Sequence, residues 1–325
     1  MLNDSFGRTH SYLRIAVTDR CNLRCRYCMP DEGIDFKPHH GILSFEEIHR
    51  LVSVFATLGI RKIRLTGGEP TVRKDLSYLV SMLSALPGIE EVTMTSNGIL
   101  LAETLDELHR AGLSRVNISL DTLRPERFRA ITRRDGIAKV LAAIDQALSL
   151  NMHPVKLNVV VMRGVNDDEL LDFADFAIRK RVTVRFIEFM PFAGNRWQSE
   201  YFISSDEIRE RLSRTYALRP LGEETSSSAR EWEISGQETR IGFISPVSNH
   251  FCASCNRLRL TVDGALRTCL LSNAEISLRD LLRGGASDEE LTRSILASLN
   301  EKPETHPGIN GLLEHENRTM ITIGG

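Results

Sequence analysis

The run Leu13-Arg14-Ile15-Ala16-Val17-Thr18 leads into Cys21-Asn22-Leu23-Arg24-Cys25-Arg26-Tyr27-Cys28 after two intervening residues. The first stretch alternates large apolar residues with smaller or polar ones, which predicts a half-buried strand. The second stretch spaces three thiols as C-x3-C-x2-C, so that one short loop can surround a single metal centre. Three ligands leave a coordination position open, whereas a structural zinc site closes with four. A four-iron cluster held by three thiolates likewise keeps one iron free.

The strand before these cysteines is the first of six strand candidates. Between the first two, Ser44-Phe45-Glu46-Glu47 forms a capping box that opens a helix, and Gly59 closes that helix. Repeated strand–helix units predict a parallel sheet with right-handed crossovers. The predicted strands are 13–18, 61–66, 91–95, 115–120, 154–161 and 182–188, and further helical patterns occupy 74–86, 101–111, 136–150 and 167–180.

The alternation within these strands indicates which kind of sheet they form. In Val116-Asn117-Ile118-Ser119-Leu120-Asp121 every second residue is polar, and the other strands show the same pattern. A sheet covered by helices on both faces has continuously apolar strands instead. We therefore predict a curved sheet with helices outside and a polar, ligand-holding concave face. Six units are too few for the eight-stranded barrel, so the predicted α/β fold is an incomplete (β/α)6 TIM-like barrel.

The C-terminal third of the chain follows a different pattern. Residues 221–230 lose all periodicity and predict a boundary loop. A hairpin is predicted from 231–234 and 239–244, and a helix from 287–298. We therefore divide the chain into a barrel domain, 1–220, and a C-terminal α+β domain, 221–325, that contains the last three cysteines of the sequence.

Composition limits the classes of protein to which the chain can belong. Its 325 residues are 42% hydrophobic and 26% charged, which is ordinary for a globular protein of this size. A formal net charge of −2 argues against a general nucleic-acid-coating role. No apolar run approaches membrane-spanning length, and no secretory signal opens the chain. We expect a cytoplasmic protein that binds neither nucleic acid nor membrane.

The six cysteines form two groups of three. Three disulfides would suit an exported protein, but in a cytoplasmic protein we expect the cysteines to bind metal. The second group is Cys252-Ala253-Ser254-Cys255, followed by Cys269. A zinc ribbon completed by His250, the only imidazole near it in the sequence, is the alternative to a second three-thiolate cluster.

Cationic residues recur on the predicted polar face. Arg257 and Arg259 are two apart on a predicted strand and therefore share a face. A solvated strand edge would explain them alone, but the barrel strands carry Arg14, Lys62, Arg64, Lys156 and Arg185 at comparable positions. A cavity holding so many cations is costly unless an anion neutralises them, and arginine forks match phosphate geometry. A nucleoside triphosphate fits, bound by side chains because no Walker-type loop is present.

The first thiol group resembles the signature of the radical S-adenosylmethionine superfamily, with Tyr27 as the aromatic before the third cysteine. Thr66-Gly67-Gly68-Glu69-Pro70 resembles the segment by which that superfamily holds the methionine end of its cofactor. The resemblance implies a cluster whose open iron is chelated by S-adenosylmethionine. It also implies that one electron from the cluster cleaves a carbon–sulfur bond and releases a 5′-deoxyadenosyl radical.

Within the superfamily, the chain resembles the GTP 3′,8-cyclase family from about residue 10 to its last residue. The resemblance is carried by 116–121, by 186–191, by the stretch from Phe243 through Leu260, and by Gly324-Gly325. It implies two [4Fe-4S] clusters, held by Cys21, Cys25, Cys28 and by Cys252, Cys255, Cys269. It implies an S-adenosylmethionine site of Tyr27, Gly68, Ser119 and Met190, and GTP contacts from Arg14, Lys62, Arg64, Thr95, Lys156, Arg185, Arg257 and Arg259. Arg14, Arg257, Arg259, Gly324 and Gly325 are the implied catalytic residues.

The family's reaction is the first step of molybdenum cofactor biosynthesis. The radical abstracts the C3′ hydrogen of GTP, and the carbon radical attacks C8 of guanine to give (8S)-3′,8-cyclo-7,8-dihydroguanosine 5′-triphosphate. The implied partners are a reductive electron donor such as flavodoxin and a downstream cyclic pyranopterin monophosphate synthase, with the enzyme a homodimer. The glycine pair is expected to reach into the catalytic cavity, so that a C-terminal extension would impair turnover.

Two other functions remain open from the sequence. A radical S-adenosylmethionine enzyme acting on peptides can also bear auxiliary clusters, but it gives no reason for the phosphate-ready cations. A zinc-stabilised binding module without catalysis is the alternative from another class. Brown, iron-containing protein would favour the enzymes, and colourless, zinc-containing protein would favour the binding module.

Overall fold

Six parallel strands form the middle of one mixed sheet in the computed structural model, which describes residues 1–325 apart from 31–32, 223–227, 307, 309–317 and 325. Each strand pairs in parallel with the next, as the alternating strand and helix patterns predict. The six strands are β3 (Tyr12–Ala16), β4 (Lys62–Thr66), β5 (Glu91–Ser96), β6 (Leu113–Ser119), β7 (Lys156–Val161) and β8 (Thr183–Glu188).

The C-terminal third extends this same sheet at both ends. At one end, β12 (Arg257–Leu260) pairs in parallel with β3, and at the other, β11 (Thr239–Ile244) pairs in parallel with β8. The outer strands are antiparallel: β13 (Ala265–Arg267) and β14 (Ile276–Ser277) beyond β12, β10 (Arg230–Ile234) and β9 (Leu218–Pro220) beyond β11. The predicted hairpin is thus confirmed. Strands from both sides of residue 220 share one sheet.

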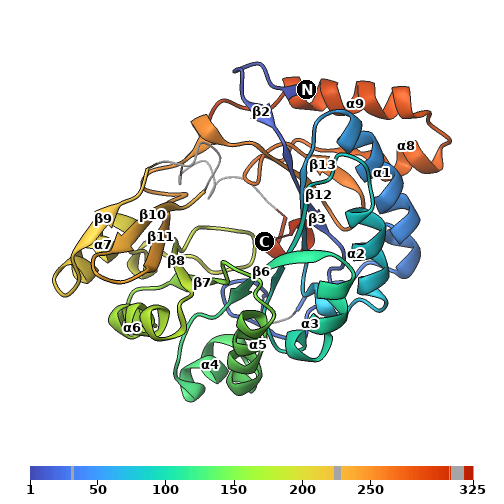
Figure 1. Ribbon diagram of the computed structural model, residues 1–325. Helices are drawn as coiled ribbons and strands as arrows, with labels where there is room; N and C mark the ends of the chain where they lie inside the picture. Colours follow the sequence, from blue (N-terminus) through green and yellow to red (C-terminus); the bar gives the residue numbers. More distant parts are fainter. Residues whose placement is uncertain (31–32, 223–227, 307, 309–317, 325) are drawn as a thin grey trace.

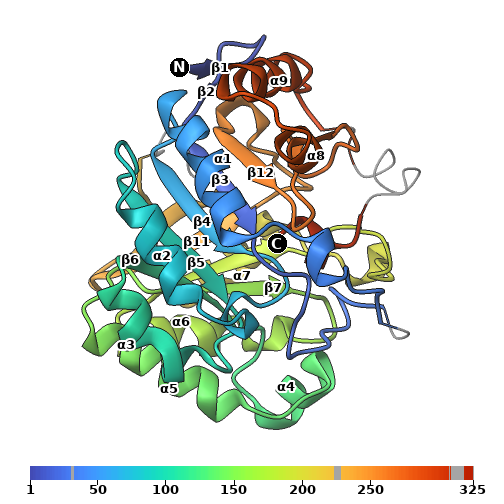
Figure 2. The same cartoon turned by 90° about the vertical axis from the view of Figure 1, so that its right-hand side faces the viewer.

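Helices cover the outer, convex side of the curved sheet (Figure 1). The five predicted helices are confirmed as α1 (Phe45–Thr57), α2 (Leu76–Ser84), α3 (Leu101–Arg110), α5 (Ile137–Ser149) and α6 (Leu170–Lys180). Ser44 and Glu47 form the predicted capping box. The predicted C-terminal helix is α9 (Asp288–Asn300), and α11 (Met320–Ile323) lies inside the curve of the sheet (Figures 1 and 2).

Besides α11, three helices of the described residues were not expected from the sequence: α4 (Pro125–Thr132), α7 (Ser205–Ser213) and α8 (Leu278–Arg283). They are short and rich in charged residues, so their apolar periodicity is weak. Single turns of 3-10 helix lie at η1 (His39–Gly41), η2 (Pro70–Val72), η3 (Asp167–Glu169), η4 (Ser199–Tyr201) and η5 (Cys252–Ser254), and a two-stranded sheet of β1 (Leu2–Asn3) and β2 (Thr9–His10) opens the chain. In the described part of the chain, no helix combines the length and apolar character needed to cross a bilayer.

The two faces of the sheet differ as predicted. Leu13, Ile15, Ile63 and Leu65 are fully buried. They belong to the hydrophobic core that also contains the apolar sides of the helices. The alternate residues of the same strands, including Arg14 and Arg64, line a cavity on the other face. The prediction of a polar concave face is therefore confirmed.

The glycine pair after β4 fixes the chain that leads into the first cysteine group. Gly68 N donates to Thr18 O at 2.7 Å, and Glu69 N donates to Arg20 O at 2.8 Å. A Cβ on Gly67 would overlap the Thr18 carbonyl, and one on Gly68 would overlap the Arg20 carbonyl. Gly67 also has a φ of +130°, which L side chains rarely adopt. These glycines therefore allow two backbone segments to approach each other directly before Cys21.

We predict that Gly67→Ala destabilises the protein by about 1–3 kcal/mol, the usual range for overpacking a rigid site. Since the shifted backbone leads to Cys21, iron incorporation at the first cysteine group should also fall. Thermal unfolding and iron content of the reconstituted protein measure both effects. Gly222→Ala is the matched control, because no atom lies within 4 Å of its added Cβ. An unchanged midpoint and iron content in Gly67→Ala would contradict this account.

Candidate active site

One cavity of about 780 Å³ occupies the concave face of the sheet. Nearly all side chains singled out from the sequence line it, although they come from positions as far apart as 14 and 269. The predicted site residues on its wall are Arg14, Cys21, Cys25, Tyr27, Cys28, Lys62, Arg64, Gly68, Thr95, Ser119, Lys156, Arg185, Met190, Cys252, Cys255, Arg257, Arg259 and Cys269. The structure thus brings these residues together; their individual roles stay predictions.

The two cysteine groups lie at opposite ends of neighbouring strands. Cys21 follows the C-terminal end of β3, and Cys255 precedes the N-terminal end of β12. Since β3 and β12 are parallel neighbours, these ends point in opposite directions along the sheet. A five-residue strand spans roughly 17 Å. The wall between the two groups is therefore long enough for a nucleotide-sized molecule.

The first cysteine loop is held by backbone contacts to the region after α4. Arg24 N donates to Thr132 O, and Arg26 N donates to Ile131 O, both at 3.0 Å. Leu23 N lies 3.4 Å from Cys21 Sγ and donates to it. All six cysteines are free thiols, which agrees with the expectation of metal ligation over disulfides.

The thiols of the first loop have pKa values shifted upward by burial. Burial raises the pKa of Cys21 to about 11 and that of Cys28 to about 12, and it holds the pKa of Cys25 well above its usual value. The neighbouring thiols add to the shift at Cys25 and Cys28. These three buried thiols resist ionisation when no cation is bound. A metal centre would supply the positive charge that converts them to thiolates.

Two buried acids brace the loop, and sequence reasoning assigned neither a role. Tyr27 OH donates to Asp121 Oδ2 at 2.6 Å, and burial raises the pKa of Asp121 to about 6. Glu69 is 1% exposed and accepts hydrogen bonds from Asn97 N and Ser96 Oγ. Glu69 lies in the glycine-rich segment 66–70 and Asp121 ends the alternating segment 116–121. Their positions in these two segments were the only sequence signal for a role at the site.

The cations form two rows across the sheet because the parallel strands are in register. Arg259 of β12, Arg14 of β3 and Arg64 of β4 are successive partners. Arg257, Tyr12 and Lys62 form the adjacent row in the same way. Like charges directly opposite each other destabilise a sheet, so the three arginines require a compensating negative charge.

The environment of these arginines disfavours their positive charge. Burial, with Arg64 and Arg257 adding to it, lowers the pKa of Arg14 to about 10. Burial, followed by Arg14 and Arg257, holds the pKa of Arg259 well below its usual value. Arg257 lies 4.6 Å from the ring centroid of Phe251. A polyanion in the cavity would relieve this mutual repulsion.

Tyr12 is a cavity residue that the sequence reasoning did not single out. It accepts a hydrogen bond from Arg64 Nε, and Lys62 Nζ lies 5.6 Å from its ring centroid. Burial alone would raise the pKa of Tyr12. The cations Arg64, Arg14 and Lys62 outweigh burial and lower the pKa to about 7. The phenol thereby becomes a titratable group at neutral pH.

Three further predicted contact residues have partners in this structure. Glu231, another cavity residue that the sequence reasoning missed, pairs with Lys156 at 3.3 Å and with Arg185 at 3.1 Å. Burial, with Arg185 adding to it, lowers the pKa of Lys156 to about 8. Thr95 lies within β5 and accepts from Arg64 Nη1 at 3.5 Å. It therefore lies beside the cationic wall.

The second cysteine loop differs electrostatically from the first. Burial opposes ionisation of Cys255, but Arg257 and Lys302 outweigh it and lower its pKa to about 7. Lys302 Nζ donates to Cys255 Sγ at 3.7 Å, a contact for which the sequence held no signal. Cys252 and Cys269 are close enough to influence each other's charge. These residues could hold a cluster through three thiolates.

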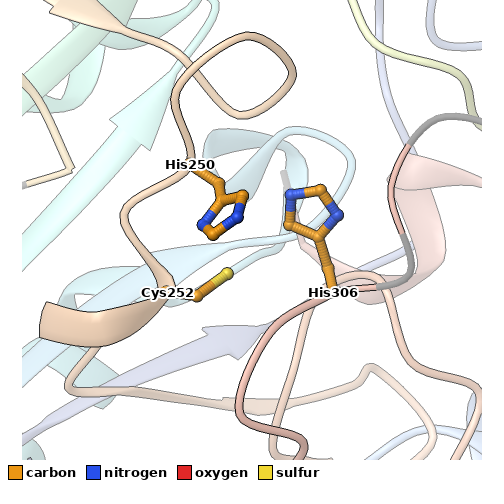
Figure 3. A group of neighbouring side chains, drawn as sticks. All are labelled: His250, Cys252 and His306. Carbon is orange, nitrogen blue, oxygen red and sulfur yellow. The ribbon is translucent and has the colours of Figure 1, made fainter.

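His250 is the only imidazole near this group in the sequence, but the fold brings a second one to it. His306, fifty-four residues after Cys252 in the chain, packs beside His250 with ring centroids 5.0 Å apart. The ligand atoms of His250, Cys252 and His306 all lie within 4.8 Å of one another, as Figure 3 shows. Two imidazoles and a thiol are ligands that zinc accepts, so the zinc alternative has three donors at this site.

The end of the chain reaches the cationic rows. Gly324 O accepts a hydrogen bond from Arg259 Nη1. Gly324 has a φ of +77°, and a Cβ on it would overlap Thr66 Oγ1. Only glycine fits this position without displacement. Gly325, the other predicted tail residue, lies outside the residues that the structure describes.

Comparison with known families covers most of the chain. Residues 15–177 match the Radical SAM superfamily, and residues 182–307 match the family described as Molybdenum Cofactor Synthesis C. By fold, the chain is similar to the crystal structure of Streptococcus suis SuiB, with a TM-score of 0.65 at 15% identity over 98% of this chain and 76% of that one. At this identity the likeness concerns the fold alone.

Two curated relatives are similar along nearly the whole chain. "Molybdenum cofactor biosynthesis protein 1" of Homo sapiens is 49% identical over 99% of this chain, which spans only 51% of that longer protein. "GTP 3′,8-cyclase" of Syntrophomonas wolfei subsp. wolfei is 47% identical over 99% of this chain and 99% of its own length. The chain therefore belongs to the GTP 3′,8-cyclase family of the radical S-adenosylmethionine superfamily.

Proposed function

We propose that the chain converts GTP to (8S)-3′,8-cyclo-7,8-dihydroguanosine 5′-triphosphate, the first step of molybdenum cofactor biosynthesis. The observation that carries the proposal is the placement of two three-thiol groups at opposite ends of one cavity, with rows of cations along the wall between them. One group alone would suit many enzymes of the superfamily. The two groups and the cations together suit radical chemistry on a bound polyanion.

The first thiol group fits a [4Fe-4S] cluster with one open iron. The donor set is three sulfurs without a fourth protein ligand, on a loop braced by Glu69 and Asp121. Bound there, the cluster with S-adenosylmethionine would supply a 5′-deoxyadenosyl radical. We assign Tyr27, Gly68, Ser119 and Met190 to the S-adenosylmethionine site. All four line the cavity, and each lies at or after the C-terminal end of a parallel strand.

The second thiol group fits a second [4Fe-4S] cluster, which we propose for Cys252, Cys255 and Cys269. The cations Arg257 and Lys302 already favour the thiolate at Cys255. An open iron at this end could hold the guanine. A zinc ion on His250, Cys252 and His306 is the competing occupant, since their ligand atoms lie within 4.8 Å of one another.

The cationic rows are the proposed seat of the triphosphate. Arginine forks bind phosphate oxygens in pairs, and each phosphate would relieve the repulsion among Arg14, Arg257 and Arg259. Lys156 and Arg185 are now held by Glu231, so GTP would compete with that carboxylate for them. Lys62, Arg64 and Thr95 complete the proposed contacts. Gly324 and Gly325 would place the chain end against the arginines that face the reacting nucleotide.

The wider architecture and partners are also proposals. We propose that the curved sheet is an incomplete (β/α)6 barrel over residues 1–220, with residues 221–325 as the part that carries the second cluster. Membership of the family supports a reductive electron donor such as flavodoxin, a downstream cyclic pyranopterin monophosphate synthase, a homodimer and a cytoplasmic location.

The function is tested by anaerobic incubation of reconstituted protein with dithionite, S-adenosylmethionine and GTP. We expect 5′-deoxyadenosine to form in a GTP-dependent way, together with a cyclised nucleotide detected by mass spectrometry.

Arg257→Ala should lower GTP-dependent turnover at least tenfold, because a charge-assisted contact is lost. Arg219→Ala, at an exposed pair on β9, is the matched control and should keep full activity. Formation of 5′-deoxyadenosine independent of GTP would contradict the substrate assignment.

Tyr12 gives the cavity a pH dependence with a defined sign. Its phenol is neutral below its pKa of about 7 and negative above it, so the cavity becomes less positive as pH rises through 7. We expect GTP affinity to fall over this interval, and bound GTP to raise the pKa of Tyr12. Calorimetric titration of GTP across the interval measures the first effect, and tyrosinate absorbance of the cluster-free protein, with and without GTP, measures the second.

The matching control distinguishes Tyr12 from other tyrosines. Tyr12→Phe should abolish the absorbance change near neutral pH and flatten the affinity profile. Tyr216→Phe should leave both unchanged, because burial and Asp175 raise the pKa of Tyr216 to about 12. Titration of Tyr12 only near its ordinary pKa of about 10 would contradict the electrostatic account.

A further inference from the structure

A buried lysine, Lys302, contacts the second cysteine loop. Lys302 follows α9 and is 3% exposed. Its Nζ donates to Arg257 O at 3.1 Å and to Cys255 Sγ at 3.7 Å, and it lies 2.7 Å from His10 Nε2. A lysine is seldom buried to this extent unless it is paired. Its contacts therefore deserve a functional explanation.

The partner His10 is suited to accept a hydrogen bond from this lysine. His10 Nδ1 lies 3.3 Å from Leu2 O, which assigns the proton to Nδ1 and leaves the Nε2 lone pair for Lys302. Burial, with Lys302 adding to it, lowers the pKa of His10 to about 4. At neutral pH the imidazole is uncharged. Burial lowers the pKa of Lys302, whereas negative charge at Cys255, Cys269 and Asp4 acts to raise it.

A second cation holds the backbone of the same loop. Arg8 Nη1 donates to Cys252 O at 2.9 Å and to Glu304 O at 2.8 Å, and Nη2 donates to Pro303 O at 2.8 Å. Arg8 is neutralised by Asp4, whose buried carboxylate accepts from Nε at 2.6 Å. The first ten residues and residues 302–304 thus enclose the loop from behind.

A thiolate at Cys255 would place a negative charge next to the ammonium of Lys302. Asp4 compensates Arg8, which leaves the ammonium of Lys302 without a carboxylate partner among the described residues within salt-bridge distance. A neutral thiol at Cys255 would compensate that charge less well and make its burial costlier. A metal-bound thiolate removes this cost. The contact between Lys302 Nζ and Cys255 Sγ therefore suits a sulfur that carries negative charge.

We propose that Lys302 is a positioning residue for the second cluster, donating a charge-assisted hydrogen bond to the sulfur of Cys255 and thereby raising the reduction potential of that cluster. The proposal rests on the proposed function, because it requires the second cluster to bind at Cys252, Cys255 and Cys269. Hydrogen bonds to ligand sulfurs and nearby charge set the potentials of iron–sulfur clusters. In the first loop, Cys21 Sγ accepts hydrogen bonds from the uncharged donors Leu23 N and Asn97 Nδ2. Among the described lysines, only Lys302 donates to a cysteine sulfur.

This difference would keep the two clusters at separate potentials. Asp121 lies close enough to Cys25 and Cys28 to oppose their negative charge, which makes the first cluster harder to reduce. Lys302 acts in the opposite direction at the second. The first cluster is then the stronger reductant, as cleavage of a carbon–sulfur bond requires, and the second holds its ligand without competing for that bond.

The test isolates the second cluster and measures its potential. In a parent variant with Cys21, Cys25 and Cys28 all replaced by Ala, only the second cluster would remain. Redox titration followed by electron paramagnetic resonance gives its midpoint potential, and iron content gives its occupancy. Adding Lys302→Met should favour the oxidised form at least tenfold, which is about 59 mV for a one-electron couple. Lys302→Arg should restore most of the parent potential, because it keeps a buried cation.

The controls separate the outcomes. Lys139→Met removes an exposed charge on α5 and should leave the potential unchanged. Loss of the cluster in Lys302→Met with retention in Lys302→Arg would also support the proposal, since the cation then determines ligation itself. An unchanged potential in cluster-loaded Lys302→Met, or cluster loss in both variants, would overturn it. A parent variant without iron would contradict the second cluster of the proposed function instead.

Discussion

Repulsion among arginines held in register across three parallel strands is the constraint on which the site depends. Arg259, Arg14 and Arg64 are adjacent because β12, β3 and β4 pair without offset, and the hydrophobic face beneath them fixes that pairing. Burying cations this close has a cost that only negative charge can offset. The hydrogen bond to Gly324 O, the lowered pKa of Tyr12 and the thiolate-favouring surroundings of Cys255 are all responses to the same positive field.

The strand directions in the sheet place the two cysteine loops at opposite ends of the cationic wall. Because β3 and β12 are parallel neighbours, the loop after one and the loop before the other lie at opposite ends of a shared wall. The acids Glu69 and Asp121 brace the loop at one end, and the cations Arg8 and Lys302 hold the loop at the other. A molecule lying along the arginines would therefore meet a radical-generating end and an anchoring end. The polarity follows from strand direction alone.

Much of this arrangement could be predicted from the sequence, because it depends on local patterns. Strand alternation predicted the polar concave face, and the capping box at Ser44 predicted the start of α1. Thiol spacing predicted both candidate metal-binding loops. Contacts between segments far apart in the sequence could not be predicted, because no local sequence pattern indicates them. Glu231 resembled any charged residue of a hairpin, Tyr12 resembled a strand residue, and His306 and Lys302 lay in a stretch without a motif. The pairing of β12 with β3, which joins the C-terminal third to the central sheet, depends on the packed fold.

The central claim is that each thiol group holds its own four-iron cluster, and metal analysis with Mössbauer spectroscopy of anaerobically reconstituted protein tests it most directly. The account predicts two [4Fe-4S] clusters per chain, about eight iron atoms with matching sulfide. Replacing either group of three cysteines by alanine should leave one cluster and halve the iron. Zinc in place of iron at Cys252, or an iron content that does not change when Cys252, Cys255 and Cys269 are replaced, would contradict it.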